Sequence, residues 1–538
     1  MSLTIRLAAA VPRCSWWALC RAGRLGLSVS ILLVRLTLRL LTSRDGTFGS
    51  ARWATTRMLR RAGALGDDGL ILAKAGRRLL RDANSEGSEL VLAPQGAGKG
   101  VGPVISNLLD YPGSVLCTDP KGENTAVTAR YRASLSRVIR LDIGDTANSD
   151  NFNPMTSIRW GTVDETDDAE QLADLMLVPD LKEESHWRRR SLAWLTGFIL
   201  HVGHAYRETP ELVSLAQVNE LVNAGNATFK AVVAEMARSD VPKVAETAAQ
   251  IAKGGDSEET RNILSNLVKG TEVWSRGKPL ARISGQSDFS FEDLYRETVT
   301  VYLVVPEEKL AIYGAFLRVM TGLALNGVLR AGRTSLPPRC RPLFLLDEAA
   351  ALGYLEPLEQ GMGYLRAYAR AMLIFQDLGQ LEATYPRARS LMANAATLVA
   401  FGVNDMATAR LISERVGQTT VAARNAGASQ ARDEVLAHRL QAGTSEAGRA
   451  LIHPDEVMNL GADEVLVFMG RRVPAAIRAR RTRYFEERRF TGRYDAWRDG
   501  RTIAANPDIT ATVVAEMGAA AASLVRAQPL ARKLCHAG

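Results

Sequence analysis

The chain has 538 residues and a mass of 58.4 kDa, which is long enough for several domains with sizeable buried cores. Apolar residues make up 46% and charged residues 23%, a globular composition that excludes a wholly disordered, collagen-like or polytopic membrane chain. The five cysteines lie far apart, without the paired spacing of a zinc site or the density of a disulfide scaffold, so we expect a reducing compartment.

The positive charge is concentrated near the N-terminus. The formal net charge is +9, and residues 1–61 alone carry eleven arginines and one acid, so the remaining chain is nearly neutral. This region is also apolar, with the run LGLSVSILLV at residues 25–34. Arg35 and Arg39 end that run short of the roughly 20 residues that span a bilayer. Such an arm suits a helix at an anionic membrane surface, and the alternative is a loosely ordered basic tail.

Short apolar runs, rich in Val, Ile and Leu, alternate with amphipathic helical segments along the rest of the chain. Runs that are apolar throughout and bounded by turn residues are typical of strands covered by helices on both faces. We therefore predict an α/β fold with a doubly wound, mostly parallel sheet. The predicted strands lie at residues 88–94, 113–119, 137–143, 298–305, 342–348, 371–377, 397–403 and 463–469.

Two segments depart from this alternation. Residues 160–288 place apolar residues at three- and four-residue spacing, which predicts an all-helical insertion. Residues 423–446 are polar and carry no strand pattern, which predicts an exposed loop.

The segment APQGAGKG, at residues 93–100, follows the first of these strands and precedes a predicted helix. Small residues let backbone N–H groups turn inward onto phosphate oxygens, and Lys99 can reach the β- and γ-phosphates of a nucleotide. The motif departs from G-x-x-x-x-G-K-[ST] at Ala93 and at Gly100, which lacks the hydroxyl that would ligate magnesium. An ordinary glycine-rich turn is the alternative. The predicted phosphate-binding residues are Gly96, Ala97, Gly98, Lys99, Gly100 and Val101.

Two adjacent acids, Asp347 and Glu348, end the predicted buried strand PLFLL. In P-loop NTPases the first acid of such a pair holds magnesium through water, and a neighbouring Glu polarises the attacking water. The alternative is a helix N-terminus, where acids are electrostatically favoured. The presence of a phosphate-binding motif in the same chain favours catalysis.

Two further residues are candidates for the same site. Gln376 ends the strand predicted at residues 371–377, where it could contact the γ-phosphate or the attacking water, or else cap a helix. Arg366 precedes that strand and could reach a neighbouring subunit's nucleotide as an arginine finger, although such arginines are more often solvated. The basic segment at residues 471–483 is either a solvated edge or a surface for phosphates or lipid.

These motifs resemble the TraG-type coupling proteins of type IV secretion and bacterial conjugation. A GKG in place of GK[ST] is common in that family, and Asp119 and Lys121 of the DPKGE motif are expected near the phosphate site. The matching segments run in order from about residue 49 to residue 490, and include GSARWAT (49–55), APQGAGKGVG (93–102), PGSVLCTDPKGE (112–123), HWRRRSLAWLTGFILH (186–201), LFLLDEAAALGYLEPLE (343–359), FQDLGQL (375–381) and FGVNDMATARLISERVGQTTV (401–421).

The resemblance implies a RecA-like ATPase that uses ATP and Mg²⁺. It also implies a homohexamer at the cytoplasmic face of the bacterial inner membrane, which feeds a relaxase–DNA complex into the type IV secretion channel. Family members usually carry two N-terminal transmembrane helices, which the arginine-interrupted arm does not match. The expected organisation is an arm (1–48), a nucleotide-binding domain in two parts (49–159 and 289–490), an all-α insertion (160–288) and a C-terminal tail (491–538).

Two functions fit this sequence. The first is an ATP-driven translocase of single- or double-stranded DNA. The second is a nucleotide-switched receptor that recruits protein substrates to the channel without processive movement. The lost magnesium hydroxyl at Gly100 and the mismatch to the family's membrane anchor favour the receptor, whereas the retention of Lys99, Asp347, Glu348 and Gln376 favours the ATPase more. A generic helicase or packaging motor shares the chemistry but does not explain the ordered matches outside the ATPase motifs.

Overall fold

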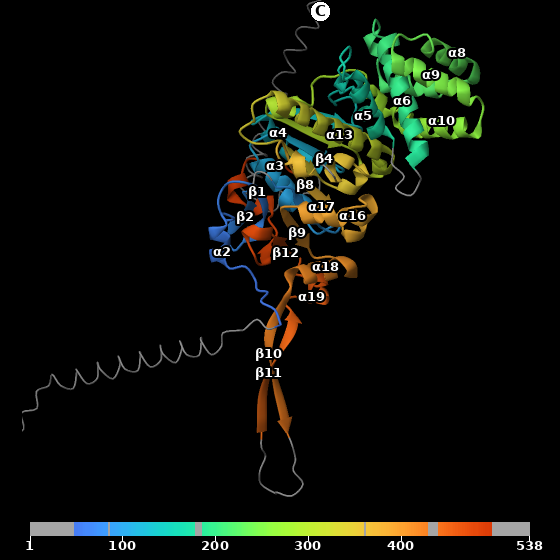
Figure 1. Cartoon of the computed structure of the whole chain (residues 1–538). Helices are drawn as coiled ribbons and strands as arrows, with labels where there is room; N and C mark the ends of the chain where they lie inside the picture. Colours follow the sequence, from blue (N-terminus) through green and yellow to red (C-terminus); the bar gives the residue numbers. More distant parts are fainter. Residues whose placement is uncertain (1–47, 84–86, 178–184, 360–361, 429–439, 498–538) are drawn as a thin grey trace, which may run out of the picture. The chain divides into compact units, whose positions relative to one another are not determined.

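The computed structural model describes residues 48–83, 87–177, 185–359, 362–428 and 440–497 (Figure 1). The predicted membrane-surface arm up to residue 47 and the predicted tail beyond residue 497 lie outside these residues. The described chain forms two compact units. One comprises residues 48–52 with 416–451, and the other comprises residues 53–415 with those from 452 onward.

The larger unit is built on an eleven-stranded sheet with the strand order β2-β1-β13-β12-β9-β3-β8-β7-β4-β6-β5. The strands from β9 to β5 are parallel to their neighbours, and β12, β13, β1 and β2 extend the sheet in antiparallel pairing. The parallel strands are β3 (Glu89–Leu92), β4 (Val115–Asp119), β5 (Arg137–Asp142), β6 (Val299–Val304), β7 (Leu343–Leu346), β8 (Arg370–Phe375) and β9 (Thr397–Phe401). The antiparallel strands are β1 (Leu70–Ala75), β2 (Arg78–Asp82), β12 (Glu464–Phe468) and β13 (Ile477–Arg480).

The predicted α/β class with a mostly parallel sheet is confirmed, and all eight expected strands form. Every residue of β3, β4, β6, β7, β8 and β9 is buried, which is why these strands read as continuous apolar runs. The sequence analysis missed β1, β2 and β13. In β13 buried and exposed residues alternate, as in a strand with one solvated face.

Helices connect the parallel strands and cover the sheet. They include α3 (Ile105–Asp110), α4 (Glu123–Ala133), α13 (Leu310–Thr334), α16 (Leu378–Thr384), α17 (Ala388–Asn394) and α18 (Met406–Val416). By length and composition, residues 307–334 are the one described helical stretch apolar enough to cross a bilayer. That is weak evidence for a membrane span, because 72% of its apolar window is buried inside the protein, as in a core helix.

An all-helical segment lies between β5 and β6, and α6, α8, α9 and α10 pack together within it (Figure 1). Amphipathic helices of this kind bury one face against each other rather than against the sheet. The segment contains α5 (Glu165–Met176), α6 (Ser185–Ala205), α7 (Leu215–Val222), α8 (Asn226–Met236), α9 (Pro242–Gly254), α10 (Glu258–Thr271) and α11 (Pro279–Ile283).

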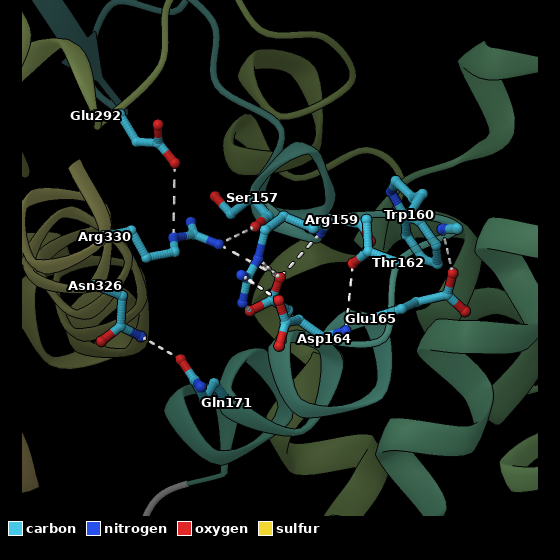
Figure 2. A network of polar contacts seen from close by, with 12 residues as sticks. Ser157, Arg159, Trp160, Thr162, Asp164, Glu165, Gln171, Glu292, Asn326 and Arg330 are labelled. Atoms are coloured by element: carbon cyan, nitrogen blue, oxygen red, sulfur yellow. Dashed lines mark hydrogen bonds and ion pairs between the residues drawn. The ribbon is translucent and has the colours of Figure 1, made fainter. Parts of the chain in front are cut away.

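A polar network joins α5, the first helix of this segment, to α13 (Figure 2). The buried Asp168 carboxylate accepts hydrogen bonds from Nε and Nη2 of Arg159, both at 2.8 Å, and lies 3.4 Å from Nη1 of Arg330. Arg330 also donates to the Ser157 carbonyl at 2.9 Å. Burial by itself raises a carboxyl pKa, but the Arg159 hydrogen bonds and the two guanidinium charges outweigh it, so the pKa of Asp168 is lowered.

Asp168→Asn should lower the free energy of unfolding by about 2–3 kcal/mol near pH 7, because it removes the buried anion that the Arg159 and Arg330 guanidinium groups share. Asp164→Asn is the matched control. Asp164 contacts Arg159 at 2.5 Å, but it is 45% exposed, so we expect a loss below about 1 kcal/mol.

The pH dependence of this effect follows from the lowered pKa of Asp168. The stabilisation should be fully present above the ordinary aspartate pKa, near 4, and should be lost as the pH falls through the lower folded-state value. Urea unfolding of the wild type and both variants, from about pH 7 to about pH 3, measures this. Equal losses in the two variants at neutral pH would contradict the assignment.

The smaller unit is a long antiparallel hairpin of β10 (Gln418–Ala428) and β11 (Leu440–Ala450). Ser50 forms an antiparallel bridge with Thr419 at its base. The loop predicted at residues 423–446 is therefore wrong over the paired residues. In a two-stranded ladder the backbone groups that face the partner strand pair with it and the outward groups bind water, so this hairpin needs no alternation of apolar residues that a sequence pattern could reveal.

Candidate nucleotide site

Four neighbouring parallel strands end at the same edge of the sheet. They lie in the order β3-β8-β7-β4. The glycine-rich loop follows β3, Gln376 follows β8, Asp347 and Glu348 follow β7, and Asp119 is the last residue of β4. Side chains that are more than 200 residues apart in the sequence therefore meet above this edge, which is where open α/β sheets bind ligands. A cavity of about 510 Å³ lies there.

Most of the predicted site residues line this cavity. Ala97 and Arg366 are not among its lining residues. Those that line it are Gly96, Gly98, Lys99, Gly100, Val101, Asp347, Glu348 and Gln376. Asp119 and Lys121, which were expected near the site, line it as well.

The glycine-rich loop connects β3 to α3 by a sharp turn. Gly96 and Gly98 have φ values of +79° and +88°, which side-chain-bearing residues rarely adopt. A π-helical turn, η1 (Gly100–Val104), follows and is kinked at Gly102 before the chain continues into α3. The helix predicted after the loop is thus present, although it begins with this irregular turn.

Lys99 forms ion pairs with both predicted acids. Its Nζ lies 3.2 Å from Asp347 Oδ1 and 2.5 Å from Glu348 Oε2. Burial lowers a lysine pKa, but the two carboxylates outweigh this effect, so the pKa of Lys99 is raised and the side chain stays protonated. A lysine held in this way carries its charge directly beside the glycine-rich loop.

The two acids have opposite pKa shifts. Burial raises the pKa of Asp347, and the charge of Lys99 offsets this only in part. For Glu348, burial is outweighed by the hydrogen bond and charge of Lys99 and by two glutamine amides, so its pKa is lowered. Glu348 is therefore ionised at neutral pH, and its oxygens are good hydrogen-bond acceptors.

Two glutamines orient the Glu348 carboxylate. Gln376 Nε2 donates to Glu348 Oε1 at 2.5 Å, and Gln380 Nε2 donates to the same oxygen at 3.3 Å. Gln380 Oε1 also accepts from the Gln376 backbone N–H at 2.7 Å. The sequence analysis missed Gln380. The signal was its place four residues after Gln376, at the third residue of α16.

Glu348 also has an unusual backbone. With φ of 59° and ψ of 53°, it is the one non-glycine residue with positive φ among the described residues. It precedes the short turn η6 (Ala349–Leu352), but its side chain makes no capping hydrogen bond there, contrary to the alternative role as a helix cap. Left-handed backbone at a non-glycine residue costs roughly 1–3 kcal/mol and is often found at functional sites.

The helix-capping alternative for Gln376 also finds no support. Asp377 is the N-cap of α16, because its side chain accepts from the Gln380 backbone N–H at 2.7 Å. The Gln376 amide is instead directed at Glu348.

Magnesium fits this site if the protein supplies one carboxylate and a bound nucleotide supplies phosphate oxygens. Among the described residues there is no group of three or more His, Cys, Asp or Glu side chains suited to a metal ion, and Gly100 offers no hydroxyl. Asp347 Oδ1 is buried and has no hydrogen-bond partner among the described residues, although Lys99 Nζ lies 3.2 Å away. Mg²⁺ typically takes one or two carboxylates and completes its shell with water and phosphate oxygens. Asp347 matches this requirement.

Asp119 has a structural role at the next strand end. Its carboxylate accepts from the backbone N–H groups of Asn124 and Thr125 and from the Thr125 hydroxyl, at 3.3, 2.8 and 2.7 Å. These bonds anchor the first turn of α4. Burial outweighs them, so the pKa of Asp119 is raised.

Arg366 is exposed, and its carbonyl accepts from Arg341 at 2.7 Å. Arg370, which lies in the same segment, is buried at the amino end of β8 and paired with Glu89. Arg370 is thus at the opposite end of β8 from Gln376. A role for Arg366 at the nucleotide site of a neighbouring subunit stays a prediction.

Residues 52–507 match the model of a protein family described as type IV secretory system conjugative DNA transfer. The conjugal transfer protein TraG of Escherichia coli is 29% identical over 486 residues, covering 82% of this chain and 76% of TraG. Protein VirD4 of Rhizobium rhizogenes is 28% identical over 490 residues, covering 86% of this chain and 69% of VirD4.

Solved structures give the same picture of the fold. The unbound bacterial conjugative coupling protein TrwB superposes with a TM-score of 0.60 at 18% identity, covering 81% of this chain and 96% of that one. TrwB in complex with ADP and Mg²⁺ superposes with a TM-score of 0.59, also at 18% identity, covering 80% and 94%. The expected RecA-like fold is confirmed.

Proposed function

The chain belongs to the type IV secretory system conjugative DNA transfer family, whose members are coupling proteins of the TraG and VirD4 type, and from this premise we propose that it is an ATP-hydrolysing DNA translocase. In this role it links a relaxase–DNA complex to the secretion channel. The observation that carries the proposal is the meeting of Lys99, Glu348 and Gln376 from three adjacent strand ends beside a glycine-rich loop.

ATP binding is proposed to rest on the loop and on Lys99. The backbone N–H groups of residues 96–101 would donate to the phosphate oxygens, and the Lys99 ammonium would exchange its two carboxylates for the β- and γ-phosphates. Asp347 would hold Mg²⁺ through water, and the bound ion neutralises charge on the phosphate oxygens. The ADP and Mg²⁺ bound by TrwB, which has the same fold, support this part of the proposal.

Hydrolysis is proposed to rest on Glu348. When Lys99 turns to the phosphates, the Glu348 carboxylate keeps its hydrogen bonds to Gln376 and Gln380 and gains a free oxygen. Because it is ionised, this oxygen can accept a hydrogen bond from water and polarise it for attack on the γ-phosphate. Gln376, anchored next to it, is positioned to contact the same water or the γ-phosphate.

The finer features of the assembly are part of the same proposal. We expect a homohexamer at the cytoplasmic face of the inner membrane, with Arg366 of each subunit facing the nucleotide of the next. Single- or double-stranded DNA would be moved by loops lining the ring, and phosphate contacts would make its binding salt-dependent. The family description, conjugative DNA transfer, supports DNA as the substrate.

ATP turnover of the full-length protein, with and without single- and double-stranded DNA, tests the proposal. A translocase should hydrolyse ATP faster on at least one form of DNA, and increasing salt should weaken that stimulation. Turnover that responds to a substrate protein and ignores DNA would instead favour the nucleotide-switched receptor. Absence of turnover under both conditions would contradict the motor.

A further inference from the structure

The basic segment at residues 471–483 is not explained by the proposed function, and the structure shows how most of its arginines are used. Arg472 pairs with Asp82 at 2.6 Å, and Arg478 pairs with Glu464 at 2.8 Å. Arg483 is paired with Asp463 at 2.7 Å. These three arginines are held in pairs within the protein and do not form a free surface for DNA or lipid.

Arg481, in the same segment, contacts the glycine-rich loop. It follows β13 and lies 384 residues after the Ala97 carbonyl, to which its Nη1 donates a hydrogen bond at 3.1 Å. A side chain on Gly98 could not coexist with this contact, since its Cβ would lie 2.4 Å from the same Nη1. The guanidinium is therefore packed directly against the peptide that joins Ala97 to Gly98.

Asp463 holds Arg481 in this position. Its Oδ1 accepts from Arg481 Nε at 2.8 Å, and its carbonyl accepts from the Arg481 backbone N–H at 2.7 Å. The Arg481 side chain is 18% exposed and that of Asp463 is 48% exposed, so the guanidinium is the partner that is shielded from water. Two strands of the antiparallel extension, β12 and β13, thus deliver a fixed positive charge to the phosphate-binding loop.

The geometry of a peptide group connects this contact to the cavity. All described peptide bonds are trans, and in a trans peptide the C=O and the following N–H point in opposite directions. The Ala97 carbonyl points to Arg481, so the Gly98 N–H points away from Arg481. Gly98 lines the nucleotide cavity, whereas Arg481 does not. The contact therefore keeps the Gly98 N–H on the side where phosphates would bind.

We propose that Arg481 is a positioning residue of the nucleotide site. Its hydrogen bond to the Ala97 carbonyl fixes the orientation of the Ala97–Gly98 peptide, so that the Gly98 N–H faces the bound phosphate, and Asp463 orients the Arg481 side chain. This inference rests on the proposed function. Without the Arg481 hydrogen bond, the Ala97–Gly98 peptide is free to rotate, because Gly98, at φ +88°, adopts positive and negative φ with similar ease. Part of the binding energy would then be lost in ordering the loop.

Arg481→Gln tests this role in the full-length protein, with Arg483→Gln as the matched control. Arg483 binds the same Asp463 oxygen, but its other terminal nitrogen donates to Glu486 instead of to the loop. We expect Arg481→Gln to weaken ATP and ADP binding about tenfold and to raise KM by a similar factor, with kcat changed less than about threefold. Arg483→Gln should change each value by less than about twofold.

Two further variants keep the test independent of folding. Asp463→Asn leaves the Arg481 contact with Ala97 possible but less well oriented, so its nucleotide affinity should fall between those of the wild type and Arg481→Gln. Arg481→Lys should recover part of the affinity, because an ammonium can donate to Ala97 without forming the fork that Asp463 accepts. Thermal unfolding midpoints of all variants report whether the fold is retained.

The outcomes separate this inference from the proposed function. Nucleotide binding that Lys99→Ala abolishes but Arg481→Gln leaves unchanged would overturn the role of Arg481 and leave the proposed function standing. Equal losses in Arg481→Gln and Arg483→Gln would also overturn it, because the loop contact would then be irrelevant. A wild-type protein that binds neither ATP nor ADP would overturn both.

Discussion

Lys99→Ala should lower ATP turnover by about a thousandfold and abolish DNA transfer, while the protein stays folded. The variant removes the loop cation that pairs with both Asp347 and Glu348. Lys99 lies in the loop after β3 and in no strand, so the sheet should form without it. ATP affinity should fall together with turnover, since the same ammonium is proposed to hold the phosphates.

The loss of Lys99 has a second consequence that can be measured. Asp347 and Glu348 would face each other without their counter-ion, so the pKa of each carboxyl should rise. A folded-state pKa raised in this way favours the folded protein at low pH and disfavours it as the pH increases. The stability difference between wild type and Lys99→Ala should therefore widen as the pH rises above the ordinary carboxyl pKa of about 4.

Lys278→Ala is the control for this experiment. Lys278 also pairs with a glutamate, Glu272, at 3.0 Å, but it lies in the helical segment and does not line the nucleotide cavity. ATP turnover, ATP binding and urea unfolding of both variants should be compared with the wild type. If Lys99→Ala and Lys278→Ala turn over ATP at the same rate, the assignment of the nucleotide site is wrong.

Glu348→Gln should separate binding from hydrolysis. The amide is similar in size to the carboxylate and can keep a hydrogen bond from Gln376, but it cannot polarise water as an anion does. We expect turnover to fall by about 10²- to 10⁴-fold, with ATP affinity within about fivefold of the wild type. Equilibrium ATP binding and steady-state turnover, measured on the same preparation, test this.

Glu359→Gln is the matched control for Glu348→Gln. Glu359 is also largely buried, and it accepts from the Arg387 backbone N–H at 2.6 Å, but it does not line the nucleotide cavity. It should retain most of the turnover. A Glu348→Gln protein that hydrolyses ATP at the wild-type rate would exclude Glu348 as the group that polarises water. The neighbouring Asp347 would then be the next carboxylate to test.

Much of the site could be predicted because its parts are local patterns. The strands that carry the site, β3, β7 and β8, are short runs buried on both faces, and such a run is visible without knowing its neighbours. Each functional side chain follows such a run directly. The carboxyl ends of parallel strands share one edge, so the glycine-rich loop, the acid pair and Gln376 could be placed together from sequence.

The features that could not be predicted depend on pairing between distant segments. Nothing local identifies residues 418–428 and 440–450 as strands, because their stabilisation comes from the backbone ladder that each provides to the other. The order of strands in the sheet is equally non-local, and it decides that β13 and β12 extend the sheet beyond β9. This extension delivers Arg481 to the phosphate-binding loop.

The sequence by itself determined the fold class, the phosphate-binding loop and the identities of Lys99, Asp347, Glu348 and Gln376 as site candidates, because these are encoded in runs of a few residues. The tertiary structure alone decided the ion pairs of Lys99, the support of Glu348 by Gln380 and the use of the basic segment in internal pairs. The physical reason is that hydrogen bonds and ion pairs act over about 3 Å in space. Which groups come that close depends on how the fold brings distant segments together, and the spacing of residues along the chain does not give it.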